Sequence, residues 1–144
     1  MDTITPENIE PCDILKYDDE HVYFYHVKKG FNGSMRDLTN QVFLAASRIQ
    51  EDRRSEFTYL KKVYEKMRIS DTYKEQVDSL EEFIEIVNKK PIFILAVKDN
   101  STKNRNLKDI EKFSSNIAKF SLNELVGNMR NLGIDFKITQ IPKA

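Results

Sequence analysis

A chain of 144 residues is long enough for one domain with its own core, and 40% hydrophobic with 32% charged residues is an ordinary globular composition. The 23 basic and 23 acidic residues cancel, so any nucleic-acid site has to be a local patch. The single cysteine, Cys12, excludes an internal disulfide, and the longest apolar run, residues 92–97, is too short to span a membrane. With no basic-then-apolar leader, we expect one cytoplasmic domain over residues 1–144.

A β-hairpin is predicted near the start of the sequence, after a loose lead-in over residues 1–10. Residues 12–17 and 22–28 are rich in aromatic and β-branched side chains, which favour strands. The tetrapeptide at residues 18–21, Asp-Asp-Glu-His, is polar and rich in turn formers. We therefore expect two antiparallel strands joined by a short loop.

This hairpin would bring three polar side chains together. With the tetrapeptide as the loop, Tyr17 lies opposite Val22, and counting outward places Asp13 opposite His26. Side chains alternate between the two faces of a strand, and directly opposed residues share a face. Asp13, His26 and Lys28 are therefore predicted to gather on one face. The simpler structural interpretation is a surface ion pair between Asp13 and Lys28.

A long helix is predicted over residues 35–54, with Ser34 as its cap. One stripe of this helix is apolar at helical spacing and is expected to face the core: Leu38, Val42, Ala45 and Ile49. Gln41 falls in the same stripe. Because a buried amide needs hydrogen-bond partners, Gln41 either bonds a backbone group or faces the polar cluster of the hairpin.

Two more helices and a central strand are predicted next. Apolar spacing indicates helices over residues 56–67 and 73–88, with Asp71 or Thr72 capping the second. Residues 91–97, PIFILAV, form a continuous apolar run, which is typical of a central strand covered on both faces. We therefore expect helices packed on the sheet.

The polar segment over residues 98–108 is predicted to be an exposed basic loop. Its cations, Lys103, Arg105 and Lys108, could contact phosphate together with Lys29, or they could simply be solvated. None of the four glycines has the spacing of a phosphate-binding loop, so any such contact would come from basic side chains.

A helix and an edge strand are predicted over the last part of the sequence. A capping box at residues 121–124 indicates a helix over residues 122–132, which Gly133 would close in the left-handed conformation. Residues 134–141 alternate between apolar and polar side chains, as half-exposed edge strands do. The order of elements predicts an α/β domain with a mixed sheet that starts with a β-hairpin and carries packed helices.

The polar cluster of the hairpin suits the hydrolysis of phosphodiesters. Such hydrolases hold Mg²⁺ with carboxylates, which neutralises charge and activates a water, and a nearby lysine stabilises the developing charge. Asp13 would be a metal ligand and Lys28 the cation. A second acidic ligand normally stands two residues before the lysine, and His26 occupies that position. Since imidazole suits Mn²⁺ better than Mg²⁺, Asp13 and His26 predict either a variant metal site or an incomplete one.

The spacing resembles the PD-(D/E)XK nuclease pattern. Asp13 follows Pro-Cys, and His26-Val27-Lys28 stands in place of Glu-x-Lys on the next strand. Many such enzymes carry a glutamine facing the site on the following helix, and Gln41 is placed to match it. The resemblance implies a restriction-endonuclease-like fold and a catalytic set of Asp13, His26, Lys28 and Gln41.

A wider resemblance covers most of the chain. Cys12-Asp13, His26-Val27-Lys28-Lys29 and Leu38-Thr-Asn-Gln41 are similar to a sporadically distributed, poorly characterised bacterial family of nuclease-like proteins, as is the C-terminal pattern over residues 120–137. That resemblance implies a role in defence or conflict systems on mobile elements. Its members are longer and have an upstream acidic ligand, for which Glu7 or Glu10 could substitute here.

Three hypotheses follow. The chain is a metal-dependent nuclease acting on DNA or RNA, or it keeps that fold without catalysis and binds nucleic acid through Lys28, Lys29, Lys103 and Arg105. In the third, it is an interaction module that forms a homodimer through residues 134–141 or joins a larger defence complex. Cys12 is expected to be a small buried hydrophobe and not a nucleophile.

Overall fold

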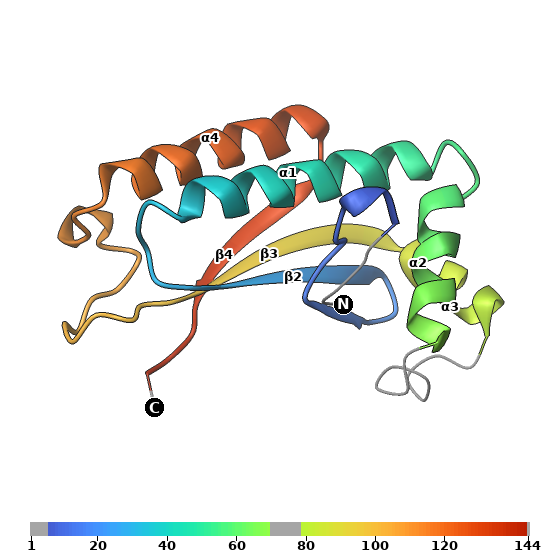
Figure 1. Cartoon of the computed structure of the whole chain (residues 1–144), viewed down its shortest axis with the longest axis horizontal. Helices are drawn as coiled ribbons and strands as arrows, with labels where there is room; N and C mark the ends of the chain where they lie inside the picture. The colour runs from blue at the N-terminus through green and yellow to red at the C-terminus, as the bar shows by residue number, and fades with distance from the viewer. Residues whose placement is uncertain (1–5, 70–78, 144) are drawn as a thin grey trace.

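The computed structural model describes residues 6–69 and 79–143, which form an α/β fold with one four-stranded mixed sheet (Figure 1). The strands follow one another across the sheet in chain order: β1 (Ile14–Tyr17), β2 (His21–Lys29), β3 (Lys90–Lys98) and β4 (Asp135–Gln140). β1 pairs with β2 antiparallel, and the other two pairs are parallel. The predicted mixed sheet, hairpin and edge strand β4 are confirmed.

The hairpin has the predicted register, because Tyr17 pairs with Val22. β2 starts at His21, one residue earlier than predicted, since Asp18 builds the turn. The carboxylate of Asp18 accepts hydrogen bonds from the backbone N–H of Glu20 (2.9 Å) and of His21 (2.7 Å). It also accepts one from the Tyr23 hydroxyl at 2.6 Å. These bonds lower the pKa of Asp18 to about 2 and hold His21 in line with the strand.

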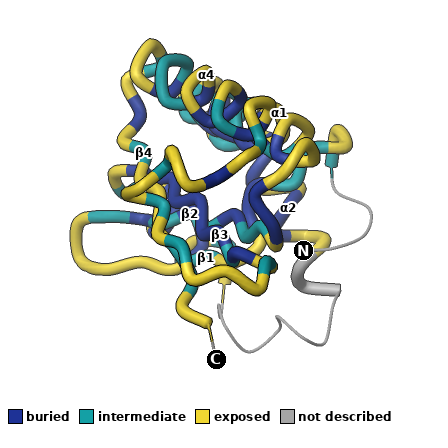
Figure 2. The backbone as a smooth tube through the Cα atoms, turned by 90° about the vertical axis from the view of Figure 1, so that its left-hand side faces the viewer, coloured by how far each residue is buried: buried dark blue, intermediate teal, exposed yellow. Residues whose placement is uncertain are grey.

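The helices α1 (Met35–Asp52) and α4 (Asn116–Leu132) lie side by side on one face of the sheet (Figure 1). Each is the crossover between two parallel strands. Right-handed crossovers that add strands in one direction put their helices on the same face. Buried residues accordingly concentrate between these helices and the strands, and the outer faces of the helices are exposed (Figure 2).

β3 is central, as predicted, but α1 and α4 cover only one of its faces. Its alternate residues Phe93, Leu95 and Val97 belong to the apolar clusters that these helices complete. Ile92, Ile94 and Ala96 are also buried, yet they point to the other face and belong to neither cluster. The prediction of a central strand buried on both faces is therefore confirmed, although α1 and α4 cover only one of them.

The helices α2 (Thr58–Ile69) and α3 (Leu80–Val87) pack against one end of the core, where the rings of Tyr64 and Phe83 lie 5.4 Å apart. Asp52 is fully buried. It is the last residue of α1, and its side chain caps the first turn of α2. Its carboxylate accepts hydrogen bonds from the backbone N–H of Tyr59 (2.7 Å) and Leu60 (2.9 Å). The predicted caps at residues 71 and 72, and the start of the predicted helix 73–88, lie outside the described residues.

α1 begins at Met35, as predicted, but its predicted side-chain cap and the predicted start of α4 are wrong. The hydroxyl of Ser34 donates to the Asn32 side chain at 2.5 Å and does not cap α1. α4 begins at Asn116, capped by Ser115, whereas Ser121 of the predicted capping box is buried inside the helix. The apolar stripe of α4 already starts at Ala118, which packs in the core, and this packing extends the helix forward. Gly133 ends α4 with a φ of 72°, as predicted.

Candidate functional site

A pocket of about 400 Å³ lies where β2 ends and α1 begins. Its lining includes all four residues of the predicted catalytic set, Asp13, His26, Lys28 and Gln41. Two further acidic side chains, Glu10 and Asp37, line it as well. Ligand sites of open α/β sheets lie beyond the carboxyl ends of parallel strands, and this pocket occupies that position on β2.

Asp13 is fixed to the second strand by its own side chain. Its backbone N–H donates to the carbonyl of Tyr25 at 2.8 Å, which extends the hairpin beyond β1. Its Oδ2 accepts a hydrogen bond from the backbone N–H of Val27 at 2.7 Å. The carboxylate is thus bound to the residue between His26 and Lys28, on the side that the hairpin register predicts.

His26 is a buried imidazole on the wall of this pocket. Only 5% of the residue is exposed, and its ring stacks on Phe93 with centroids 5.9 Å apart. Neither Nδ1 nor Nε2 has a hydrogen-bond partner. Burial lowers the pKa of His26 to about 4, although the carboxylate of Asp13 acts in the opposite direction. At neutral pH the ring is therefore uncharged, and both of its nitrogens are buried without a hydrogen-bond partner among the described residues.

Gln41 and Lys28 reach the pocket from different elements. Gln41 is exposed, so the expectation of a buried amide is wrong. The buried stripe of α1 is Val42, Ala45 and Ile49, and Gln41 borders it on the pocket side. Lys28 is half-buried near the end of β2.

The structure separates the two candidates for an upstream acid. Glu10 lines the pocket, whereas Glu7 forms a two-bond ion pair with Arg48, at 2.9 and 3.0 Å. Asp37 was not singled out from the sequence. It lies four residues before Gln41, and residues at that spacing share a helix face, so the position of Gln41 was the signal that could have identified it.

Comparison with protein families matches residues 1–142 to one family, described as a family of unknown function, DUF6119. The chain belongs to DUF6119. Searches of curated proteins and of solved structures found no match. The DUF6119 match spans the pocket, both apolar clusters and β4, so the candidate site is part of the family's domain.

A divalent ion at the DUF6119 pocket would have few protein ligands. The described residues contain no ready group of three or more His, Cys, Asp or Glu side chains that could hold a metal. Mg²⁺ keeps several waters and is often bound through one or two carboxylates together with substrate phosphates. Asp13 would supply one carboxylate, and His26 could add an imidazole nitrogen, a donor better suited to Mn²⁺ than to Mg²⁺.

Cys12 has no place in this chemistry. It is fully buried in the core cluster next to the hairpin, and burial raises the pKa of its thiol. A thiol held in its protonated form is a poor nucleophile, which agrees with the expected role as a small buried hydrophobe.

Within the described ranges, no helix has the length and apolarity to cross a membrane.

The basic loop at residues 98–108 is only partly exposed. Arg105 donates two hydrogen bonds to Asp99, at 2.9 and 2.7 Å, and its guanidinium lies 4.2 Å from the ring centroid of Phe113. Asp99 is 2% exposed. The prediction that Arg105 contacts nucleic acid is therefore not supported, because its charge is used inside the protein. The other predicted phosphate contacts are exposed: Lys29, Lys103 and Lys108.

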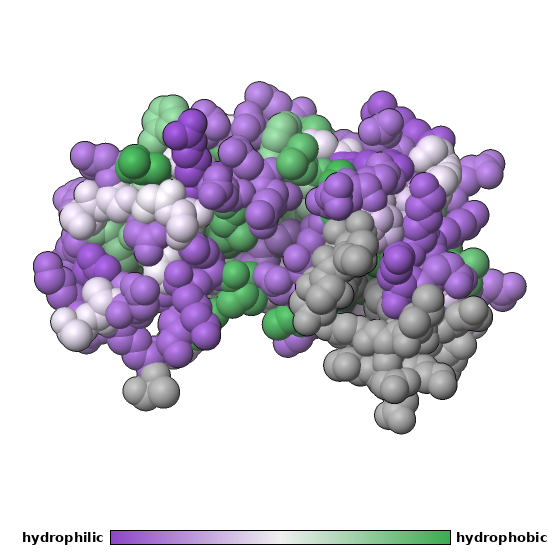
Figure 3. All heavy atoms as spheres, viewed as in Figure 1, coloured by the Kyte–Doolittle hydropathy of each residue, from purple (hydrophilic) through white to green (hydrophobic). Residues whose placement is uncertain are grey.

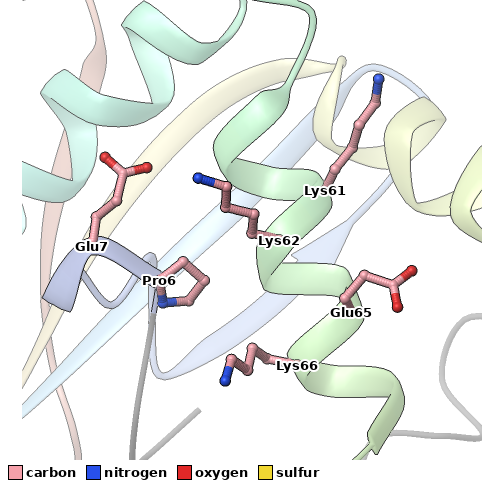
Figure 4. Close-up of a pocket in the computed structure, with 6 residues that line it drawn as sticks. All are labelled: Pro6, Glu7, Lys61, Lys62, Glu65 and Lys66. Atoms are coloured by element: carbon pink, nitrogen blue, oxygen red, sulfur yellow. The ribbon is translucent and has the colours of Figure 1, made fainter.

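A second groove, of about 460 Å³, lies between the lead-in and α2 (Figure 4). Lys62 and Lys66 extend from α2 toward Pro6 and Glu7, whereas Glu65 points to the other side (Figure 4). None of the residues that line this groove is buried. It has no counterpart of the buried, unpartnered His26, so we place the candidate site at the hairpin.

Proposed function

We propose that this DUF6119 domain is a metal-dependent nuclease that hydrolyses DNA or RNA phosphodiesters. The observation that carries the proposal is the shared pocket of Asp13, His26, Lys28 and Gln41. These side chains come from the hairpin and from α1. Buried polar groups normally have hydrogen-bond partners, so an unpartnered imidazole beside the other three is not expected of a surface cluster formed by chance. The restriction-endonuclease-like fold and the role in a prokaryotic or phage defence system, in the cytoplasm, are part of the same proposal.

Each residue of the pocket would have its own role in the reaction. Asp13 and His26 would hold Mg²⁺ or Mn²⁺, with waters completing the coordination. When bound, the ion neutralises the scissile phosphate and lowers the pKa of a bound water. The ammonium of Lys28 would stabilise charge that develops on the phosphate oxygens. The amide of Gln41 would orient the attacking water, and Lys29 would contact a neighbouring phosphate.

The second candidate is a nucleic-acid-binding domain of the same fold without catalysis. It is favoured by the neutral imidazole at the position where nucleases of this pattern carry an acid. A site with one firm carboxylate holds Mg²⁺ weakly, whereas Lys28, Lys29, Lys103 and Lys108 would still attract phosphate. A homodimer through the edge strand β4, or a larger defence complex, remains compatible with both candidates.

The deciding experiment incubates the protein with plasmid, single-stranded DNA and RNA in Mg²⁺ and in Mn²⁺. We compare Asp13→Ala and Lys28→Ala with matched controls on the same hairpin, Asp19→Ala and Lys16→Ala, which lie outside the pocket. Cleavage that only the two pocket variants lose supports the nuclease.

The other outcomes separate the remaining hypotheses. Cleavage that is equal in the wild type and in all variants comes from a contaminant and overturns the proposal. Binding without cleavage, weakening steeply with salt, supports the second candidate. A protein that neither binds nor cleaves, and is a dimer by light scattering, is an interaction module.

A further inference from the structure

A groove of about 530 Å³ runs between the amino-terminal halves of α1 and α4, away from the candidate catalytic pocket. Phe120 and Ile117 of α4 line it and are 68% and 56% exposed. Apolar surface appears over this end of α4 among hydrophilic atoms (Figure 3). A phenylalanine exposed to this extent gains almost nothing from folding, so the groove is a candidate binding surface.

The polar residues around Phe120 distinguish this groove from an apolar docking surface. Asn40 and Arg36 of α1, and Asn116 and Glu124 of α4, share its lining, and all four are exposed. Within the described residues, no ion pair or hydrogen bond engages the guanidinium of Arg36. An amphipathic partner helix requires a continuous apolar groove, which these amides and charges interrupt.

We propose that this groove binds one unpaired nucleobase of the nucleic acid, stacked on Phe120. Every base has a π-face that stacks on an aromatic side chain. The amides of Asn40 and Asn116 can donate to and accept from a base edge, and Glu124 can accept from an exocyclic amino group. The carboxylate of Glu124 would repel a phosphate, which is why we assign a base to the groove. The cation of Arg36 is suited to the adjoining phosphate.

The inference rests on the proposed function and narrows its substrate to single-stranded or locally opened nucleic acid. The groove and the catalytic pocket lie on opposite sides of the first turns of α1, which supplies Arg36 and Asn40 to one and Asp37 and Gln41 to the other. A helix with its side chains is ~10–12 Å across. At the ~3.4 Å per nucleotide of a duplex strand, about three nucleotides cover that distance, and a more extended single strand covers it in fewer.

The test measures binding, so it does not depend on cleavage. A short single-stranded oligonucleotide containing 2-aminopurine, and a hairpin duplex of the same composition, are titrated with the full chain in EDTA. Fluorescence anisotropy reports affinity, and quenching of 2-aminopurine reports stacking. We expect Phe120→Ala to weaken single-strand binding about 5- to 100-fold and to remove the quenching. Phe120→Trp should retain both, and duplex binding should not change.

Leu44→Ala is the matched control. Leu44, on α1, is also a large exposed apolar residue, but it does not line the groove. It should bind like the wild type. Equal single-strand affinity of wild type and Phe120→Ala overturns the base site alone, and Asp13-dependent cleavage then still supports the nuclease. A wild type that binds no oligonucleotide in EDTA overturns the base site, and cleavage in Mg²⁺ and Mn²⁺ then decides the nuclease separately. A dimer in light scattering that Phe120→Ala dissociates assigns the groove to a protein contact and overturns the base site.

Discussion

The carboxylate of Asp13 accepts a hydrogen bond from the backbone N–H of Val27 at 2.7 Å, across the two strands of the hairpin. One carboxylate oxygen is therefore engaged by the fold, and the other is left for a ligand. The same contact fixes Asp13 between the two predicted site residues of β2. The carboxylate of Asp13 therefore has two roles, one in holding the hairpin together and one in binding a ligand.

Replacing Asp13 with Asn should separate these two roles. The amide oxygen can still accept from Val27, so the free energy of unfolding should change by less than about 1 kcal/mol. The neutral amide should no longer hold a divalent ion, and stabilisation by Mn²⁺ in thermal unfolding should disappear. Asp19→Asn, in the turn of the hairpin, is the control and should keep the Mn²⁺ effect. An unchanged Mn²⁺ effect in Asp13→Asn would place the metal elsewhere.

His26→Phe should stabilise the metal-free protein. A buried polar ring without partners is unfavourable by about 1–3 kcal/mol relative to a well-packed apolar one, and a phenyl ring keeps the stacking on Phe93. Urea unfolding in EDTA should give a gain of about 1 kcal/mol, with loss of any Mn²⁺ effect. A variant less stable than the wild type would show that the imidazole has a partner in solution.

Stability should fall in mild acid because of the same histidine. Burial lowers the pKa of His26 from 6.5 to about 4, so between these values the unfolded chain binds a proton that the folded chain excludes. Lowering the pH from about 7 to about 5 should therefore remove about 2 kcal/mol from the free energy of unfolding. Urea unfolding at both pH values checks this, and His26→Phe should show a much smaller loss. A wild type and a variant with equal pH dependence would contradict the burial of a neutral imidazole.

The hairpin and its site residues could be predicted because their determinants are local. Strand alternation and a polar turn fix the register of Tyr17 and Val22, and the register fixes which side chains share a face. The prediction that Gln41 faces this cluster is confirmed, whereas the prediction that it is buried is wrong. Helix periodicity predicts the direction of a side chain only approximately. It could not distinguish a side chain that faces the core from one that faces the rim of the pocket.

What the sequence could not reveal depends on contacts between distant segments. The sequence predicts Arg105 to be an exposed phosphate contact or a solvated cation, because its partner Asp99 has no local signature of burial. The start of α4 was missed because its cap is Ser115, whereas the sequence offered a complete capping box only at residues 121–124, and because Ala118 is buried by packing. The groove at Phe120 requires two helices that are far apart in the chain, and no motif connects them.

Arg105→Ala should destabilise the fold by about 2–3 kcal/mol, because it leaves the buried carboxylate of Asp99 without its main partner. Lys103→Ala and Lys108→Ala, on the same loop, should change stability by less than about 0.5 kcal/mol. Chemical denaturation compares the three variants. If Arg105→Ala is as stable as the lysine variants and weakens nucleic-acid binding, the original interpretation of Arg105 as a phosphate contact is restored.

Asp52→Ala should be among the most destabilising single changes in the chain. It removes the acceptor of two buried N–H groups, those of Tyr59 and Leu60, and the expected loss is about 2–4 kcal/mol. Glu51→Ala, the exposed neighbour, is the control and should be close to neutral. Helix content by circular dichroism should fall in Asp52→Ala alone, and an intact α2 in that variant would contradict the capping role.

The candidate pocket is lined by residues from a single continuous stretch, residues 10–41. Long-range loop closure is therefore not needed to bring its groups together, only to support them from β3. Substitutions at the exposed positions of α2 and α3 should therefore leave the arrangement of these groups intact, because neither helix lines the pocket. The buried side chains of the same helices complete the core, so this part of the domain can be redesigned on its outer surface only.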